Sequence, residues 1–216
     1  MSPNPGTARS SQRRRLAIVL ALNLALIGGL VTVGIAARSV GVLAAAGDTL
    51  ADSVALALGL IAVAVRDRDP DRPRANRPIA IVAVINATIL IAVAGGVVIE
   101  AIARLREGSP AVLGLPMAVI SLITLALMIA GALVLGLSAH HEDIHMRSVL
   151  LDTLADAAAA AGVLVAGVII SITGGFYWLD PVIALLLAAV IGYAGTRLAV
   201  QAVAALRGAD VDFDDD

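Results

Sequence analysis

Long apolar runs separated by short polar segments dominate this sequence. A helix needs about 20 apolar residues to cross a hydrocarbon core of roughly 30 Å. Runs of that length lie at about residues 16–37, 42–65, 79–103, 113–138, 147–173 and 179–205. Backbone groups in lipid must be hydrogen-bonded within their own segment, so each run is predicted to be helical. The pattern therefore predicts an all-α fold, a polytopic bundle of six transmembrane helices.

Composition supports lipid as the solvent. Hydrophobic residues make up 60% of the 216 residues, against about 45–50% in soluble domains. The chain contains no cysteine, which excludes disulfides and thiolate metal sites. The six-helix transmembrane domain is assigned to residues 16–207. Residues 1–15 are interpreted as a disordered cytoplasmic tail without a signal peptide, and residues 208–216 as an acidic tail.

The distribution of arginine predicts the orientation, because basic residues favour the cytoplasmic side of a membrane. One side of the bundle carries Arg13, Arg14, Arg15, Arg66, Arg68, Arg72, Arg74, Arg77, Arg147 and Arg207, and the other side carries Arg38, Arg104 and Arg106. Both termini are therefore predicted to be cytoplasmic. Phe176, Tyr177 and Trp178 fall on the opposite side, where an aromatic belt is expected. Asp180 and Pro181 are predicted to cap the start of the sixth helix.

An exact repeat is the most informative motif. The pentapeptide DTLAD occupies residues 48–52 in the second run and residues 152–156 in the fifth. Each copy places two carboxylates four residues apart, on one face of a helix. The two runs cross the membrane in opposite directions, so the copies can face one another. The carboxylates concerned are Asp48, Asp52, Asp152 and Asp156.

Four carboxylates in a membrane indicate a ligand that compensates them. One Asp at the centre of a membrane helix costs about 2.5–3.5 kcal/mol. A divalent cation offsets this cost, and oxygen ligands suit Zn²⁺ as well as Mn²⁺, Fe²⁺ or Co²⁺. Metal binding requires deprotonated carboxylates, so metal and protons compete and an exchange of the two is predicted. Two alternatives stay open: protonated carboxylates that hydrogen-bond between helices, and a proton relay without metal.

At this point the chain resembles the cation diffusion facilitator family over roughly residues 20–207. Members carry a His/Asp-x-x-x-Asp motif in the second and fifth helices, where this chain has its repeat. Further matches are Asn23, Ser39, Glu100, Arg104, Leu105 and the run Trp178-Leu179-Asp180-Pro181. The resemblance implies a homodimeric metal/proton antiporter that exports divalent ions from the cytoplasm, with a tetrahedral site between the second and fifth helices. We expect it in a bacterial inner membrane.

The chain departs from the family pattern in three respects. Many members have His at the first motif position of the fifth helix, whereas this chain has Asp in both motifs, an arrangement associated with manganese. Zinc, manganese, iron, cobalt and cadmium are therefore all retained as candidate ions. The usual cytoplasmic domain after the sixth helix is missing, which indicates either a short member of the family or a truncated chain. The loop between the second and third helices has no histidine; Asp67, Asp69 and Asp71 are interpreted as surface charges there.

A polar cluster precedes the fifth helix, formed by His140, His141, Glu142, Asp143 and His145. It has two interpretations: metal capture at the cytoplasmic mouth, or a hydrated loop whose carboxylates cap the helix.

Other polar residues within the runs have structural interpretations beside functional ones. Glu100 and Arg104 are predicted to form an i,i+4 pair. Asn23 either hydrogen-bonds between helices or lines the metal path. Thr49 and Thr153 either support the neighbouring carboxylates or bond their own helix. Gly28-Gly29 and Gly95-Gly96 are predicted to allow close helix approach.

Three other function classes fit the sequence less well. An intramembrane aspartyl protease would carry a Tyr-Asp pair and a Gly-x-Gly-Asp motif, and neither occurs. A proton-coupled exporter of another small solute would need an aromatic-lined pocket, and aromatic residues make up only 2% of the chain. A non-transporting membrane subunit would have little use for the repeat. We therefore expect no enzyme activity, organic cofactor or nucleic-acid partner, and we expect lipid, divalent metal ions, protons and a second copy as partners.

Overall fold

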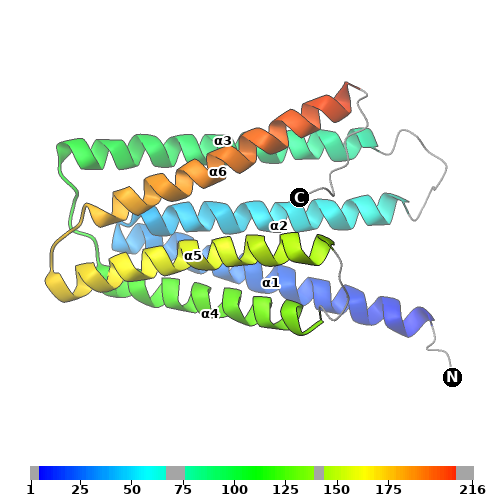
Figure 1. Ribbon diagram of the computed structural model, residues 1–216, viewed down its shortest axis with the longest axis horizontal. Coiled ribbons are helices and arrows are strands. Elements are labelled where there is room, and N and C mark those ends of the chain that lie inside the picture. The colour runs from blue at the N-terminus through cyan, green and yellow to red at the C-terminus, as the bar shows by residue number, and fades with distance from the viewer. Residues whose placement is uncertain (1–4, 67–75, 139–143, 208–216) are drawn as a thin grey trace.

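The computed structural model describes residues 5–66, 76–138 and 144–207, with side chains over 21–54, 57, 80–130, 133 and 154–207. Within these residues the chain forms six α-helices and no strand (Figure 1). The helices are α1 (Pro5–Ala37), α2 (Val40–Arg66), α3 (Asn76–Glu107), α4 (Gly114–Ser138), α5 (Ile144–Thr173) and α6 (Leu179–Leu206). The predicted all-α, six-helix fold is confirmed.

The helix bounds agree with the predicted runs except at the start of α1. The sequence predicts a disordered tail over residues 1–15, whereas α1 already begins at Pro5. Proline is tolerated at the first helical position, where its missing N–H is not needed. The residues that follow include Ala, Arg and Gln, which are good helix formers. Local propensity therefore favours a helix that extends beyond the apolar run.

The helices pack in pairs along a common axis. α3 packs along α6 and α4 packs along α5, while α1 and α2 contact each other and join the pairs. α1 begins and α6 ends at the same end of the bundle, which we call the terminal end (Figure 1). At the opposite end, the distal end, the α1–α2, α3–α4 and α5–α6 connections lie together.

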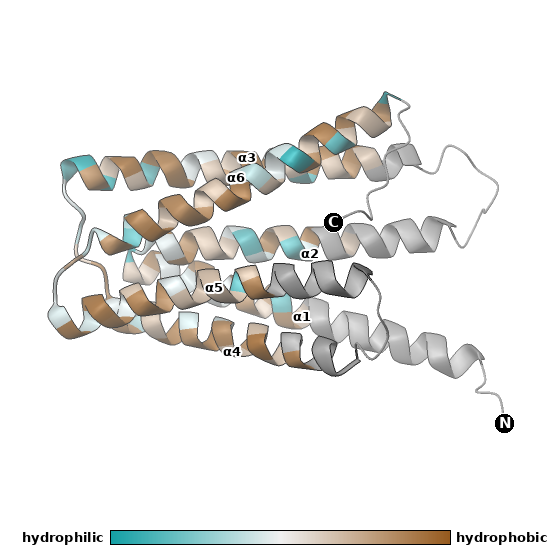
Figure 2. Ribbon diagram, viewed as in Figure 1, coloured by the Kyte–Doolittle hydropathy of each residue, from teal (hydrophilic) through white to brown (hydrophobic). Residues whose placement is uncertain are grey.

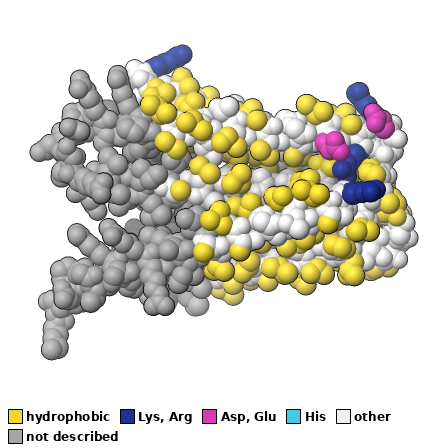
Figure 3. Space-filling view, turned by 180° about the vertical axis from the view of Figure 1, so that it is seen from behind, with side chains coloured by type: hydrophobic (Ala, Val, Ile, Leu, Met, Phe, Trp, Pro, Cys, Tyr) yellow, Lys and Arg dark blue, Asp and Glu magenta, His cyan; other side chains and the backbone are white. Residues whose placement is uncertain are grey.

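The bundle has the surface of a membrane protein. Large apolar side chains cover its sides, and the helices are predominantly apolar along their described length (Figure 2). On the face shown in Figure 3, the charged side chains drawn lie toward the two ends of the described part. Three helices in the described part of the chain are long and apolar enough to cross a membrane: Ala80–Glu107, Leu154–Thr173 and Leu179–Leu206. Ala21–Ala37 and Gly114–Ala130 are shorter apolar helices.

Of the predicted glycines, Gly29 is in ordinary contact with α4, since its Cβ would lie 3.5 Å from Ile120 Cδ1, but the closest helix contacts lie at other glycines. A Cβ at Gly28, Gly95 or Gly96 would meet nothing within 4 Å, so these glycines face open space. At Gly167 in α5, by contrast, a Cβ would lie 2.7 Å from the backbone nitrogen of Ala118 in α4. The two backbones are in direct contact there, which makes α4–α5 a tightly joined pair.

Candidate functional site

The first DTLAD copy lies midway along α2. Thr49 is buried and Leu50 is exposed, while Asp48 and Asp52 are half-buried. The Thr49 hydroxyl donates a hydrogen bond to the Ala45 carbonyl oxygen at 2.9 Å. Of the two interpretations of Thr49, the structure shows the bond to its own helix.

Helix α3 lies directly against α2 beside this motif. A Cβ at Gly47, the residue before Asp48, would be 2.7 Å from Val93 Cγ1 of α3. A side chain at position 47 would therefore force Val93 to move. α3 therefore forms one wall beside the first pair of carboxylates.

The second DTLAD copy lies in α5 and is described in part. Asp156 is half-buried and begins a stripe that continues with the buried Ala160 and Val163, at i+4 and i+7. Leu154, on another face, is exposed. The side chain of Asp152 lies outside the described residues.

The two motif helices are antiparallel and in contact (Figure 1). At 1.5 Å per residue, Asp52 lies about 18 Å from the start of α2 at Val40, and Asp156 lies about 25 Å from the end of α5 at Thr173. α5 extends beyond the start of α2 at the distal end (Figure 1). The two motif copies therefore lie on neighbouring helices that run in opposite directions.

No three acidic or histidine side chains within the described set are close enough together to hold a metal ion. Asp152 does not belong to that set, so the four-carboxylate site stays a prediction. The loop cluster also falls outside it: residues 140–143 are not described, and His145 is described only as part of the α5 backbone. Asn23 is half-buried in α1.

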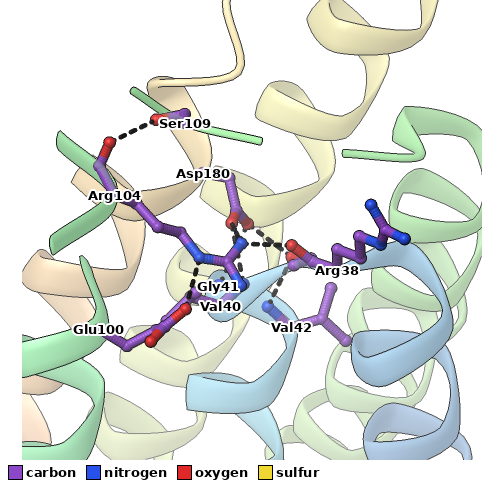
Figure 4. Close-up of polar contacts among 9 residues, drawn as sticks. Arg38, Val40, Gly41, Val42, Glu100, Arg104, Ser109 and Asp180 are labelled. Atoms are coloured by element: carbon purple, nitrogen blue, oxygen red, sulfur yellow. Dashed lines mark hydrogen bonds and ion pairs between the residues drawn. The ribbon is translucent and has the colours of Figure 1, made fainter. Parts of the chain in front are cut away.

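A second polar centre lies at the distal end, and it shows that the predicted capping role of Asp180 is wrong. Asp180, predicted to cap its own helix, is the second residue of α6; the N-cap is Trp178, which makes no side-chain capping bond. The Asp180 carboxylate is fully buried and instead accepts hydrogen bonds from the first turn of α2 (Figure 4). The donors are Ser39 Oγ at 2.5 Å, Val40 N–H at 2.8 Å and Gly41 N–H at 3.1 Å.

Arg104 of α3 adds a cation to this centre. Its Nε donates to Glu100 Oε1 at 2.8 Å, so the predicted i,i+4 pair is confirmed. Its Nη1 lies 3.8 Å from Asp180 Oδ2 and also donates to the Arg38 carbonyl oxygen (Figure 4). Arg104 therefore links α3 to α6 and to the α1–α2 connection. We call Ser39, Glu100, Arg104 and Asp180, with the backbone of residues 38–41, the Asp180 clamp.

The end of α1 presents the Arg38 carbonyl to this clamp. Arg38 has a left-handed backbone, with φ of 56°. Its N–H bonds the Ile35 carbonyl at 3.2 Å, and the Ser39 N–H bonds the Gly34 carbonyl at 2.9 Å. These two bonds form a Schellman motif, which usually has glycine at the left-handed position. The motif turns the chain from α1 into α2 and places Ser39 beside Asp180.

The α5–α6 connection carries the aromatic residues. Phe176 and Trp178 are exposed, and the Tyr177 hydroxyl donates to the Gly174 carbonyl at 2.8 Å. They lie at the distal end, and their place in an outer membrane interface stays a prediction.

Comparison with known proteins agrees with this architecture. The family model for the cation efflux transmembrane domain matches residues 16–207. A zinc transporter, ZitB of Yersinia pestis, is 30% identical over 195 residues, which are 88% of this chain and 62% of that protein. The metal cation efflux system protein CzcD of Cupriavidus metallidurans is 29% identical over 177 residues, 81% of this chain and 55% of that protein. The chain thus spans roughly three fifths of the length of these relatives.

Proposed function

The chain belongs to the cation efflux family, the cation diffusion facilitators, and from that premise we propose that this integral membrane protein exports divalent metal ions from the cytoplasm in exchange for protons. Both motif copies lie within the matched residues, and each begins eight residues after the first residue of its helix. The proposal places the ion between α2 and α5, held by Asp48, Asp52, Asp152 and Asp156.

The observation that carries the proposal is the arrangement of the repeat. Two identical acid pairs lie on antiparallel helices that touch, and Asp156 belongs to the interior stripe of α5. Carboxylates inside a membrane protein are costly unless a partner compensates them. A divalent cation between the two pairs supplies that compensation for both helices at once. Carboxylate oxygens suit zinc, manganese, iron and cobalt, and cadmium belongs to the same candidate group.

Proton exchange follows from the chemistry of the ligands. Carboxylates must be deprotonated to bind metal, so an arriving ion displaces protons and returning protons displace the ion. Alternating access of the site to the two sides of the membrane then couples metal export to proton entry.

The setting of the transporter is part of the same proposal. It works as a homodimer in a bacterial inner membrane, with both termini in the cytoplasm, as the arginine distribution predicts. The histidine-containing cluster at residues 140–145 would then lie at the cytoplasmic mouth, where it can capture metal. The proposal requires no organic cofactor and no nucleic acid.

Transport by purified protein in liposomes tests the proposal. Wild type, Asp52→Asn and Asp156→Asn are compared for uptake of Zn²⁺, Mn²⁺, Cd²⁺ and Co²⁺. Glu107→Gln, the same kind of change at an exposed residue at the end of α3, is the matched control. We expect transport by wild type and the control and none by the two Asp variants. Metal uptake that survives both Asp substitutions would refute the site; no uptake by wild type would favour a non-transporting subunit or another solute.

A further inference from the structure

The Asp180 clamp holds the helix that carries the first acid pair. The Asp180 carboxylate accepts hydrogen bonds from the Val40 and Gly41 N–H groups. Ser39 Oγ accepts another from the Val42 N–H at 3.0 Å. The first N–H groups of a helix have no partner within the helix, so they need acceptors from elsewhere. In α2 these acceptors come from Ser39 beside the helix and from a distant helix, α6. The start of α2 is thereby bonded to α6 rather than only packed against it.

The charge of Asp180 is matched from two sides. The N-terminus of a helix carries partial positive charge, which favours a carboxylate. Arg104 supplies a full positive charge from α3 at 3.8 Å. A fully buried carboxylate with these partners has a defined position, because any displacement breaks several polar contacts at once. The clamp therefore joins α2, α3 and α6 at one point of the distal end.

We propose that Asp180 is a positioning residue for metal transport, which sets the height and rotation of α2 and so the places of Asp48 and Asp52 relative to α5. This inference rests on the function proposed above. Asp48 and Asp52 lie about 12 and 18 Å along α2 from Val40. The helix between them is continuous and contains no proline. A displacement of its first turn is consequently passed on to both carboxylates.

Metal sites respond to small displacements. Ligand distances are held to within about 0.2 Å in a working site. A shift of a few tenths of an ångström in α2 is enough to favour a larger or a smaller ion. Zn²⁺ and Cd²⁺ have the same charge but differ in size, so their relative affinity reports on the geometry of the site. A loss of folded protein lowers transport of both ions equally and leaves this ratio unchanged.

Two substitutions perturb the clamp without touching the proposed ligands. Asp180→Asn keeps the shape of the side chain but removes its charge and one acceptor. Gly41→Ala adds a Cβ 3.0 Å from Asp180 Oδ1, so the carboxylate and the first turn of α2 must separate slightly. The matched control is Gly95→Ala, the same change within α3, where the Cβ meets nothing within 4 Å.

The experiment measures KM for Zn²⁺ and for Cd²⁺ in liposomes containing each protein. We expect Asp180→Asn to change the ratio of the two KM values by about tenfold, the lower end of the range for residues that orient metal ligands. Gly41→Ala should change it in the same direction by a smaller factor, and Gly95→Ala should leave it at the wild-type value.

An unchanged ratio in both clamp variants, with wild type active, would overturn the inference and leave the proposed function intact. If Asp180→Asn does not fold, the Gly41→Ala ratio decides alone. Absence of transport by wild type, in contrast, would refute the proposed function and the inference with it.

Discussion

The contact between α4 and α5 supports a quantitative prediction about stability. At Gly167 a Cβ would lie 2.7 Å from the Ala118 nitrogen, 3.1 Å from Ala118 Cα and 3.1 Å from the Gly114 carbonyl oxygen. All three are backbone atoms of α4, and backbone atoms cannot rotate away as a side chain can. Gly167→Ala must therefore force the two helices apart.

The expected loss of unfolding free energy follows from a comparison with a second glycine in α5. A Cβ at Gly162 meets nothing within 4 Å. Either substitution gains about 0.8–1.0 kcal/mol from the helix propensity of alanine. Only Gly167→Ala adds an overpacking cost, typically about 1–3 kcal/mol. The difference in unfolding free energy between the two variants is thus the packing cost alone, since the propensity terms cancel.

Thermal unfolding of purified protein in detergent, followed by circular dichroism, measures this difference. We expect Gly162→Ala to melt at or above the wild-type temperature. Gly167→Ala should melt lower than Gly162→Ala by at least about 2 °C, since 1 kcal/mol corresponds to about 2–4 °C in a chain of this size. Equal melting temperatures would show that α4 and α5 are not in backbone contact at this point, and the reasoning would fail.

Three further predictions concern the transport site and the clamp. Thr49→Val should keep transport and change the unfolding free energy by less than about 1.5 kcal/mol, because the hydroxyl donates its hydrogen bond to the Ala45 carbonyl of its own helix. Lost transport by well-folded protein would place the hydroxyl on the ion path. Glu100→Gln should lower the unfolding free energy by less than about 1 kcal/mol, because Glu100 is exposed. Arg104→Leu should lower it by about 3 kcal/mol or more, because buried Asp180 loses its cation. Equal losses of stability in thermal melts of the two variants would contradict the clamp. An acidic liposome lumen should speed Zn²⁺ uptake, because protons then leave the liposome as metal enters. An internal fluorescent indicator measures this uptake. An uptake rate that does not depend on the pH gradient would refute proton exchange.

The helices could be predicted from sequence because their signal is local. Each apolar run is long, and lipid leaves the backbone no alternative to a helix. The i,i+4 pair of Glu100 and Arg104 was predictable for the same reason, since a helix fixes that spacing. That each copy of the repeat lies within a helix, one in α2 and one in α5, could also be predicted from the runs.

The role of Asp180 could not be predicted, because its hydrogen-bond donors lie about 140 positions earlier in the chain. The Asp180-Pro181 dipeptide has a sufficient local explanation as a helix start, and nothing nearby contradicts it. The close-contact glycines were missed for a related reason. Gly95 and Gly167 look alike in sequence, and only the rotation of each helix about its axis decides which faces a neighbour.

The Asp180 clamp also has a consequence for biogenesis. Helices leave the ribosome in order, so α2 enters the membrane long before α6 is synthesised. Until α6 arrives, the Val40 and Gly41 N–H groups lack the acceptor that Asp180 provides in the finished bundle. An unsatisfied backbone group in lipid costs several kcal/mol. Nascent chains that stop before α6 are therefore expected to keep the start of α2 at the hydrated interface, where quality-control proteases can recognise an unfinished chain.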